Sequence, residues 1–279
     1  DTFERIHKSA HYLLNVRPAG KWPAAYFYYV GGVPAVMEEI RHSLHLDVKT
    51  VTGKTLGENL DELKKNGFYE NCARLLELTG LKKEQIIYPY DNPIGDKGTI
   101  AILKGNLAPE GAVVKHSAVP KEMHVAMLNA RPFDCEEDAI AAVLSRAIRP
   151  GDAVFIRYEG PKGSGMPEMF YTTEAISSDE ELGKSIALIT DGRFSGASKG
   201  PAIGHVSPEA AEGGPIALVE EGDLIEIDIP GRSLHLCVED AELAERRKNW
   251  VCPEPKIKTG YLARYAKLVS SADRGAILE

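Results

Sequence analysis

The stretch Ser185-Ile-Ala-Leu-Ile-Thr-Asp-Gly-Arg-Phe-Ser-Gly-Ala-Ser-Lys-Gly200 combines the two patterns on which the fold prediction rests. Its first six residues form a short apolar run that is rich in isoleucine, which is typical of a strand. Glycines at 192, 196 and 200 then follow, and glycine permits turns and close backbone approaches. We therefore expect a strand that delivers the chain into a loop able to carry functional groups.

Similar apolar runs recur through the second half of the chain. The expected strands are Thr99–Leu103, Ala112–Lys115, Ala153–Tyr158, Ile186–Thr190 and Leu224–Ile229. The last of these alternates apolar and polar residues, so one of its faces should contact water. Pro230-Gly231 then turns the chain into Ser233–Val238 as a hairpin. Helices are expected at 136–147, 239–249 and 261–269.

The first 85 residues have a different pattern, because their apolar residues recur at helical spacing. Helices are predicted at 1–14, 34–46, 55–65 and 71–78. Tyr88-Pro-Tyr-Asp-Asn-Pro93 is the best linker candidate, since residues that precede proline avoid the helical region. The predicted fold class is therefore α+β, with a helical N-terminal piece followed by a β-rich domain that has flanking helices.

Length and composition exclude several classes of protein. The chain has 279 residues, which suffices for one large domain or two ordinary ones. Its formal net charge is −8, so it lacks the basic surplus of a nucleic-acid binder. We find no signal peptide and no apolar run near the roughly 18 residues of a membrane span. We therefore expect neither nucleic acid nor a membrane as partner, and a location in the cytoplasm or, in a eukaryote, an organelle matrix.

The four cysteines are Cys72, Cys135, Cys237 and Cys252, and no two of them have the spacing of a metal-binding pair. Four cysteines in a chain of this length do not make a disulfide scaffold. We interpret them as reduced thiols in a reducing compartment.

Candidate functional residues lie in three glycine-rich stretches, Arg157–Met169, Thr190–Gly200 and Gly204–Pro215. Successive backbone N–H groups in such turns can bind an anion. In the second stretch the polar side chains of Arg193, Ser195 and Ser198 should converge. The alternative is a purely structural turn with solvated charges, because a glycine motif alone is weak evidence for a site.

Two acidic residues of the first stretch are candidate metal ligands. Glu159 and Glu168 flank a loop without bulky side chains, and such a carboxylate could ligate a hard cation through oxygen. An exposed carboxylate in a flexible loop is the alternative. His124 and His205 lack a second ligand at helix or strand spacing, so we interpret them as ordinary polar or core histidines.

Five blocks of this sequence resemble the dihydroxy-acid dehydratase and phosphogluconate dehydratase family. They occur in the same order as in the family and span nearly the whole chain, which makes the likeness specific. The blocks are Val51–Leu56, Leu103–Ala112, Arg157–Met169, Thr190–Gly196 and Gly204–Val219. The ending Lys258–Ala272 resembles the dihydroxy-acid branch rather than the sugar-acid branch.

The resemblance covers only about the second half of the family's usual chain. It implies that residues 1–95 are the tail of an N-terminal α/β domain and that residues 96–279 form a β-barrel-like swivelling domain. In the family, the N-terminal domain carries the cysteines of an iron–sulfur cluster, and those motifs are absent from this sequence. The resemblance thus implies cluster ligands outside this chain, an N-terminal half as partner, and a homo-oligomer.

The resemblance also implies roles for individual residues. Glu168 matches the family's Mg²⁺-binding glutamate, and Ser195 matches the serine proposed as the base. Ser198 and Arg193 are not carried over from the family, and it is their place in the second glycine-rich stretch that makes them candidates for binding the substrate. The implied reaction removes the C2 proton of a 2,3-dihydroxy acid and expels the C3 hydroxide, with iron of the cluster as Lewis acid. The resulting enol becomes a 2-keto acid, and the charge that develops requires a nearby cation.

Within the matched half, three segments depart from the family pattern. Residues 61–85 look like an insertion, Ala24–Tyr26 replaces an acidic stretch, and Val125–Asn129 replaces a glycine-containing segment. We predict half of a hydro-lyase of branched-chain amino-acid biosynthesis that uses Mg²⁺ and an iron–sulfur cluster. Two alternatives remain open, half of a sugar-acid dehydratase and a non-catalytic module that binds a small acid or a protein.

Overall fold

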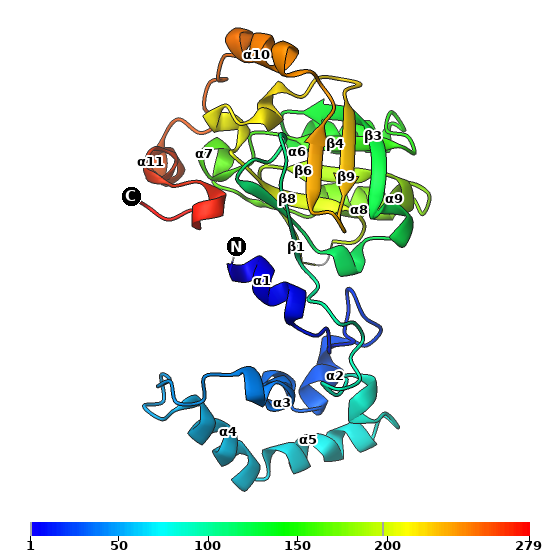
Figure 1. The fold of residues 1–279 in the computed structure, drawn as a ribbon, viewed down its shortest axis with the longest axis vertical. Helices are drawn as coiled ribbons and strands as arrows, with labels where there is room; N and C mark the ends of the chain where they lie inside the picture. The colour runs from blue at the N-terminus through cyan, green and yellow to red at the C-terminus, as the bar shows by residue number, and fades with distance from the viewer. Residues whose placement is uncertain (1, 197) are drawn as a thin grey trace. The chain divides into compact units, whose positions relative to one another are not determined.

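The computed structural model describes residues 2–196 and 198–279, so Asp1 and Ala197 lie outside the described residues. The chain divides into two compact units, residues 1–98 (unit 1) and residues 99–279 (unit 2) (Figure 1). In the two described ranges, no helix combines the length and the apolar character that a membrane crossing needs.

Unit 1 is helical, as predicted. Its α-helices are α1 (Thr2–Ser9), α2 (Ala24–Tyr29), α3 (Gly32–Glu39), α4 (Leu56–Lys65) and α5 (Phe68–Glu77). Helix α4 begins at its predicted position because Thr55 and Glu58 form a capping box, in which each side chain accepts a hydrogen bond from the other residue's backbone N–H. The small core of unit 1 consists of buried Val30, Ala35, Leu76, Ile86 and Ile87, with partly buried apolar residues packed around them.

Unit 2 is a mixed structure of strands and helices. The strands of its large sheet are β1 (Ala101–Leu103), β2 (Gly111–Val114), β3 (Val125–Phe133), β4 (Asp152–Ile156), β6 (Ala187–Thr190), β8 (Ala202–Ser207), β9 (Leu224–Asp228) and β10 (Ser233–Leu236). A separate small sheet pairs β5 (Glu168–Met169) with β7 (Arg193–Phe194) in parallel. The α-helices are α6 (Glu136–Leu144), α7 (Pro161–Ser164), α8 (Tyr171–Ser177), α9 (Leu182–Ser185), α10 (Asp240–Asn249) and α11 (Gly260–Leu268).

The large sheet curls into a nearly closed barrel. Its strand order is β1-β2-β8-β6-β4-β3-β9-β10, and the central strands β8, β6, β4 and β3 are parallel neighbours. The two edge strands meet just beyond β1, where Lys104 forms a bridge with Ser233. There the Lys104 N–H donates to Arg232 O and the Leu234 N–H donates to Lys104 O, each at 3.0 Å. The expected α+β fold with a barrel-like domain is therefore confirmed.

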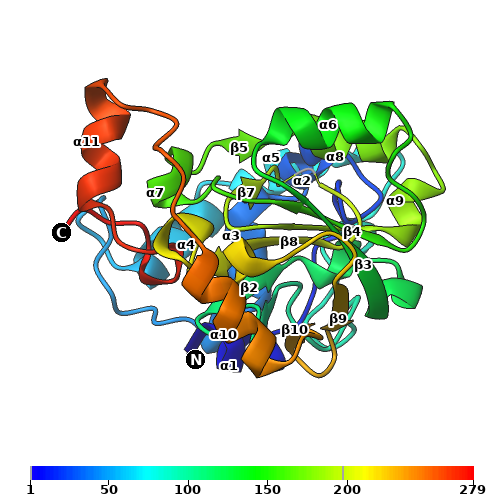
Figure 2. The same cartoon turned by 90° about the horizontal axis from the view of Figure 1, so that it is seen from above.

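The central strands are buried on both faces, which explains their continuous apolar sequences. Phe155 and Ile189 point into the main core inside the barrel. Val154 and Leu188, one residue earlier on each strand, point outward into a second core shared with α6, α8 and α9. These three helices lie together along one side of the sheet (Figure 2). Because successive side chains of a strand point to opposite faces, each of these strands contributes side chains to both cores.

The sequence analysis missed two strands of the barrel. In β3, the buried Leu128 and Ala130 alternate with the exposed Val125 and Met127, so apolar residues on both faces hide the two-residue period. In β8, a glycine and a histidine stand at mid-strand, and both weaken the strand signal. Short helices α7, α8 and α9 were also not predicted.

Two helices of unit 1 end earlier than predicted. Helix α1 ends at Ser9, because Tyr12 and Leu14 form bridges with Gly95 and Ile87 instead of continuing the helix. Helix α3 ends at Glu39, and a short 3₁₀ turn follows it. Long-range pairing therefore overrides the helical periodicity of the first fourteen residues.

The two-core arrangement predicts that Phe155 is critical for unit 2. Replacing it with alanine removes a fully buried ring from the barrel interior and should cost about 3–5 kcal/mol of unfolding free energy. Urea denaturation followed by circular dichroism measures this cost. Leu144→Ala is the control, since that side chain is exposed and its loss should cost about 0.5 kcal/mol or less. Equal costs for both variants would contradict the packing described above.

Candidate active site

Three glycine-rich loops, residues 157–169, 190–200 and 204–215, meet at the buried side chain of Asp191. Its carboxylate accepts hydrogen bonds from the backbone N–H groups of Tyr158 (3.1 Å), Glu159 (3.0 Å) and Ala210 (2.8 Å). Tyr158 and Glu159 belong to the first loop, Asp191 to the second and Ala210 to the third. One side chain therefore connects all three stretches that the sequence analysis singled out.

A second buried carboxylate, that of Glu209, holds the start of α7. Its oxygens accept hydrogen bonds from the Lys162 N–H at 2.9 and 3.1 Å and from the Gly163 N–H at 3.0 Å. Gly160 lies directly against this carboxylate. A Cβ atom at position 160 would stand 2.4 Å from Glu209 Oε2, so the first loop requires glycine there.

The two buried carboxylates have unusual titration behaviour. Burial raises the pKa of Asp191 to about 6, although three backbone N–H donors favour its charged form. Burial likewise raises the pKa of Glu209 to about 7, and the charge of Asp191 acts in the same direction. The two carboxylates at the junction of the three loops therefore become protonated at a higher pH than ordinary carboxylates do.

Glu159 attaches the first loop to the C-terminal segment 252–258. Its Oε1 accepts a hydrogen bond from Lys256 Nζ and its Oε2 accepts one from Ser164 Oγ, each at 2.5 Å. The Glu159 side chain is buried, and such an ion pair is sheltered from screening by salt.

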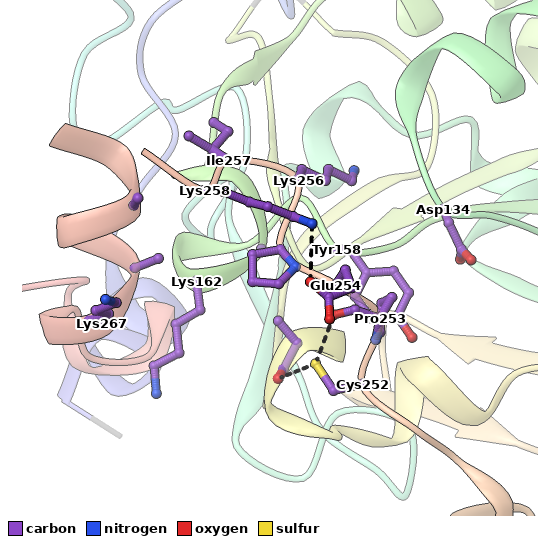
Figure 3. Close-up of a pocket in the computed structure, with 15 residues that line it drawn as sticks. Asp134, Tyr158, Lys162, Cys252, Pro253, Glu254, Lys256, Ile257, Lys258 and Lys267 are labelled. Atoms are coloured by element: carbon purple, nitrogen blue, oxygen red, sulfur yellow. Dashed lines mark hydrogen bonds and ion pairs between the residues drawn. The ribbon is translucent and has the colours of Figure 1, made fainter. Parts of the chain in front are cut away.

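Beside this ion pair lies a pocket of about 460 Å³, lined by α7, α11 and segment 252–258 (Figure 3). Four lysines line it: Lys162, Lys256, Lys258 and Lys267. Three of them pair with glutamates, since Lys162 contacts Glu212, Lys256 contacts Glu159 and Lys258 contacts Glu254. None of the four predicted site residues lines this pocket, so it is separate from the site that the sequence indicated.

The structure brings Glu168 and Arg193 together. They stand opposite each other in the parallel pair of β5 and β7. Arg193 Nη1 lies 3.8 Å from Glu168 Oε2, and Arg193 Nε donates to Met166 O at 3.0 Å. Both side chains remain about half exposed, at 47% and 48%. The pair therefore presents a carboxylate and a guanidinium that solvent or a ligand can reach.

The same small sheet holds the two predicted serines nearby. The Ser195 N–H donates to Met169 O at 3.4 Å, which attaches the second loop to β5. The Ser198 N–H donates to Ser195 O at 3.0 Å and closes a turn. Ser198 is 6% exposed, and its Oγ has no hydrogen-bond partner within residues 2–196 and 198–279. Buried hydroxyls normally have a partner, so this one is available to a ligand.

The described residues do not form a metal site by themselves. They contain no group of three or more His, Cys, Asp or Glu side chains that could hold a metal ion. Glu168 offers one hard oxygen donor, which suits Mg²⁺ as a single ligand of a larger set. Cys72, Cys135, Cys237 and Cys252 are all free thiols, and none belongs to such a group. They do not fit an iron–sulfur cluster, which several thiolates must hold together.

His205 occupies a conformation that the sequence does not reveal. It has a φ of 57°, and its N–H donates to Gly192 O at 2.9 Å, so it links β8 to the second loop. Burial, followed by the positive charge of Arg193, lowers the pKa of His205. Both effects favour the neutral imidazole beside the second loop.

The two carboxylates that join the loops were not predicted from the sequence. Asp191 stands directly after a buried strand and before a glycine, which is a usable signal in retrospect. Glu209 had no comparable signal, because its backbone partners Lys162 and Gly163 lie far away in the sequence. Local pattern indicates which loops matter but not which side chain connects them.

Comparison with known proteins identifies the class to which this fold and site belong. A family profile described as dihydroxy-acid/6-phosphogluconate dehydratase C-terminal matches residues 85–276. The corresponding N-terminal profile matches residues 1–59. The chain therefore belongs to the dihydroxy-acid/6-phosphogluconate dehydratase family, and the resemblance carried by the five sequence blocks is confirmed.

Individual relatives are named for one branch of that family. The chain is 50% identical over its whole length to a dihydroxy-acid dehydratase of Acetivibrio thermocellus, covering 48% of that protein. It is 55% identical over 95% of its length to one of Agathobacter rectalis, covering 45% of it. It is 49% identical over its whole length to dihydroxy-acid dehydratase 1 of Methanosarcina acetivorans, covering 48% of it. The chain thus spans about half the length of the curated relatives it matches.

The raised pKa of Glu209 predicts a specific dependence of stability on pH. The folded state binds this proton more tightly than the unfolded chain, in which a glutamate titrates near 4.3. The resulting stabilisation is complete below about pH 4.3 and is lost as the pH rises through about 7. We expect Glu209→Gln to reduce the loss of unfolding free energy between these two pH values, as measured by urea denaturation.

Asp191 contributes with the same sign and is coupled to Glu209 by charge, so the comparison measures the titration of Glu209 together with its coupling to Asp191. The exposed Glu110 provides the control, and Glu110→Gln should leave the pH dependence of the wild type unchanged. If the unfolding free energy changed equally with pH in wild type and in Glu209→Gln, Glu209 would have the same pKa in the folded and unfolded states.

Proposed function

We propose that this chain is the C-terminal half of a hydro-lyase that dehydrates a 2,3-dihydroxy acid to a 2-keto acid in branched-chain amino-acid biosynthesis. The observation that carries the proposal is the pairing of Glu168 with Arg193 in a small sheet, together with the hydrogen bond from the Ser195 N–H to Met169 O of the same sheet. A carboxylate for a cation, a guanidinium for an acid and a hydroxyl for a proton are the groups that such a reaction needs. The named relatives support the dihydroxy-acid branch.

In this proposal Ser195 accepts the C2 proton of the substrate. A serine hydroxyl is a weak base, so it acts only where nearby positive charge stabilises its alkoxide. Arg193 and the Ser198 hydroxyl bind the substrate carboxylate, since a guanidinium and an O–H are both suitable donors to that group. When its carboxylate is bound in this way, the substrate presents its C2–H bond to Ser195.

Glu168 would hold Mg²⁺ as one of several ligands, and the others would come from the N-terminal half. When bound, the ion supplies positive charge for the substrate carboxylate and the C2 oxygen. The half-exposed position of Glu168 leaves its carboxylate accessible for this purpose. The iron–sulfur cluster of the family would lie entirely on ligands outside this chain, so no step here is assigned to it.

A second candidate is a non-catalytic module that binds a small acid in the pocket beside α11. The four lysines of that pocket are the observation in its favour. Their charge is largely balanced, because three of them form ion pairs with glutamates. Arg193 is also paired, with Glu168, but their separation of 3.8 Å is longer than the 2.5 Å of Lys256–Glu159 and the 3.1 Å of Lys258–Glu254, so the charge of Arg193 is less closely balanced. Half of a sugar-acid dehydratase is the remaining alternative, and a substrate panel distinguishes it.

A chimeric enzyme tests the proposal directly. Residues 1–279 would replace the matching region of the Acetivibrio thermocellus relative, followed by anaerobic reconstitution with iron, sulfide and Mg²⁺. We expect 2-keto acid formation from 2,3-dihydroxyisovalerate and little from 6-phosphogluconate. Ser195→Ala should reduce kcat about 10²–10⁴-fold, because it removes the base.

Ser178→Ala is the matched control, since that hydroxyl is exposed at the end of α8 and should leave turnover unchanged. A chimera that binds iron but forms no keto acid from either substrate would overturn the proposed function. Turnover by the 279-residue chain alone would overturn its dependence on an N-terminal half.

The metal role of Glu168 has its own test in the same chimera. Glu168→Gln removes the negative oxygen donor, so the Mg²⁺ concentration that gives half-maximal turnover should rise about tenfold or more. Titration of Mg²⁺ after EDTA treatment measures this concentration. Glu174→Gln on the exposed face of α8 is the control. An unchanged Mg²⁺ requirement in Glu168→Gln would remove Glu168 from the metal site.

A further inference from the structure

The segment that follows β2 packs against the loop that carries Ser195. Lys115 Nζ donates a hydrogen bond to the carbonyl oxygen of Gly196 at 2.8 Å. The Gly200 N–H donates to the carbonyl oxygen of Ala118 at 3.0 Å. Two contacts, one near each end of residues 196–200, therefore join this loop to residues 115–118.

Lys115 is the cation that the segment after β2 brings into contact with the turn following Ser195. Of the ion pairs within the described parts of the chain, none includes Lys115, whereas Arg193 is paired with Glu168. Its hydrogen bond goes to the residue directly after Ser195. The Lys115 side chain is partly buried, and this burial lowers the pKa of its ammonium. Its hydrogen bond to Gly196 is exposed, so its charge acts on neighbouring groups through a partly screened field.

Ser195 is consequently held from two directions. Its own N–H donates to Met169 O, next to Glu168 on β5. On the other side, its neighbour Gly196 accepts the hydrogen bond from Lys115. A Cβ atom at Gly196 would meet nothing within 4 Å, so at this residue the turn has open space beside it. The hydrogen bond from Lys115 constrains the turn at this residue, in addition to the hydrogen bond from the Ser198 N–H to Ser195 O that closes it.

Two buried hydroxyls mark this junction as a place prepared for a ligand. Ser117 Oγ, between Lys115 and Ala118, and Ser198 Oγ both lack a hydrogen-bond partner in the portion of the chain that the structure describes. The two serines lie in the two segments that Lys115 connects. Since buried polar groups are normally satisfied, a bound acid is the natural partner for hydroxyls beside an ammonium.

We infer that Lys115 is the positioning residue of Ser195. It fixes the Ser195–Gly196 turn through its hydrogen bond, and its charge stabilises the Ser195 alkoxide. This inference rests on the proposed function, because it takes Ser195 as the base. The Ser195 alkoxide takes the C2 proton and becomes a neutral hydroxyl. The electron pair of the C2–H bond forms the C2–C3 double bond, and the C3–O bond breaks with its electron pair on the departing hydroxide. Transfer of the proton from Ser195 to this hydroxide gives water and restores the alkoxide. Lys115 remains protonated throughout.

Hydrogen–deuterium exchange on the 279-residue chain tests the positioning without any need for activity. Lys115→Met removes the donor but keeps an unbranched side chain. We expect amides of residues 195–200 to exchange about tenfold faster in this variant, because the turn loses its constraint. Lys115→Arg should keep most of the protection. Lys121→Met, an exposed lysine six residues later, is the control and should match the wild type. Equal exchange in wild type and Lys115→Met would overturn the inference.

The chimera then tests the electrostatic part. Without the ammonium the pKa of Ser195 rises, so the rising limb of kcat against pH should move up by about one unit or more in Lys115→Met. The KM should change much less, and Lys115→Arg should restore the wild-type profile. An active chimera in which Lys115→Met keeps the wild-type profile would overturn the inference. An inactive wild-type chimera overturns the proposed function instead, and the exchange result still decides whether Lys115 positions the turn.

Discussion

The carboxylate of Asp191 is the contact on which the candidate site depends. It lies at the end of β6 with no exposure to solvent, and it accepts three backbone hydrogen bonds from two other loops. Backbone N–H groups buried in loops must find partners, and here one side chain satisfies three of them. Strand β6 of the barrel fixes the position of Asp191, and the three hydrogen bonds to Asp191 fix the backbone of the other two loops beside it.

The contacts of Asp191 also determine where the proposed site residues lie. The first loop continues from Glu159 through α7 to Glu168, and the second continues from Asp191 to Arg193 and Ser195. Because both loops start from the same carboxylate, the two-residue strands β5 and β7 can pair in register. A pair of such short strands would be marginal alone. The relative placement of a carboxylate, a guanidinium and a hydroxyl therefore follows from one buried acid several residues away.

Much of this arrangement could be predicted from sequence, and the rest depends on long-range contacts. Strands near Ala153–Tyr158 and Ile186–Thr190 were identified because their apolar runs face a core on both sides. The strand β3 was missed, since Val125 and Met127 are apolar but exposed. Likewise the motifs indicated Glu168 and Ser195, while Glu209 and Lys115 were not found. Their partners lie 46 and 81 residues away, beyond the reach of any local pattern.

Apolar side chains that are exposed on unit 1 support the proposal that this chain is half of an enzyme. Its described residues form helices and isolated bridges rather than a sheet, and apolar side chains such as Ile6, Tyr28, Val33 and Leu78 stay exposed. Helices with one apolar face need a layer to pack against. In unit 2, the described residues place no group of three or more candidate metal ligands around Glu168, which we propose as a ligand of Mg²⁺. Under the proposed function, an N-terminal α/β domain would supply both a sheet for the helices of unit 1 and the further ligands that the cation needs.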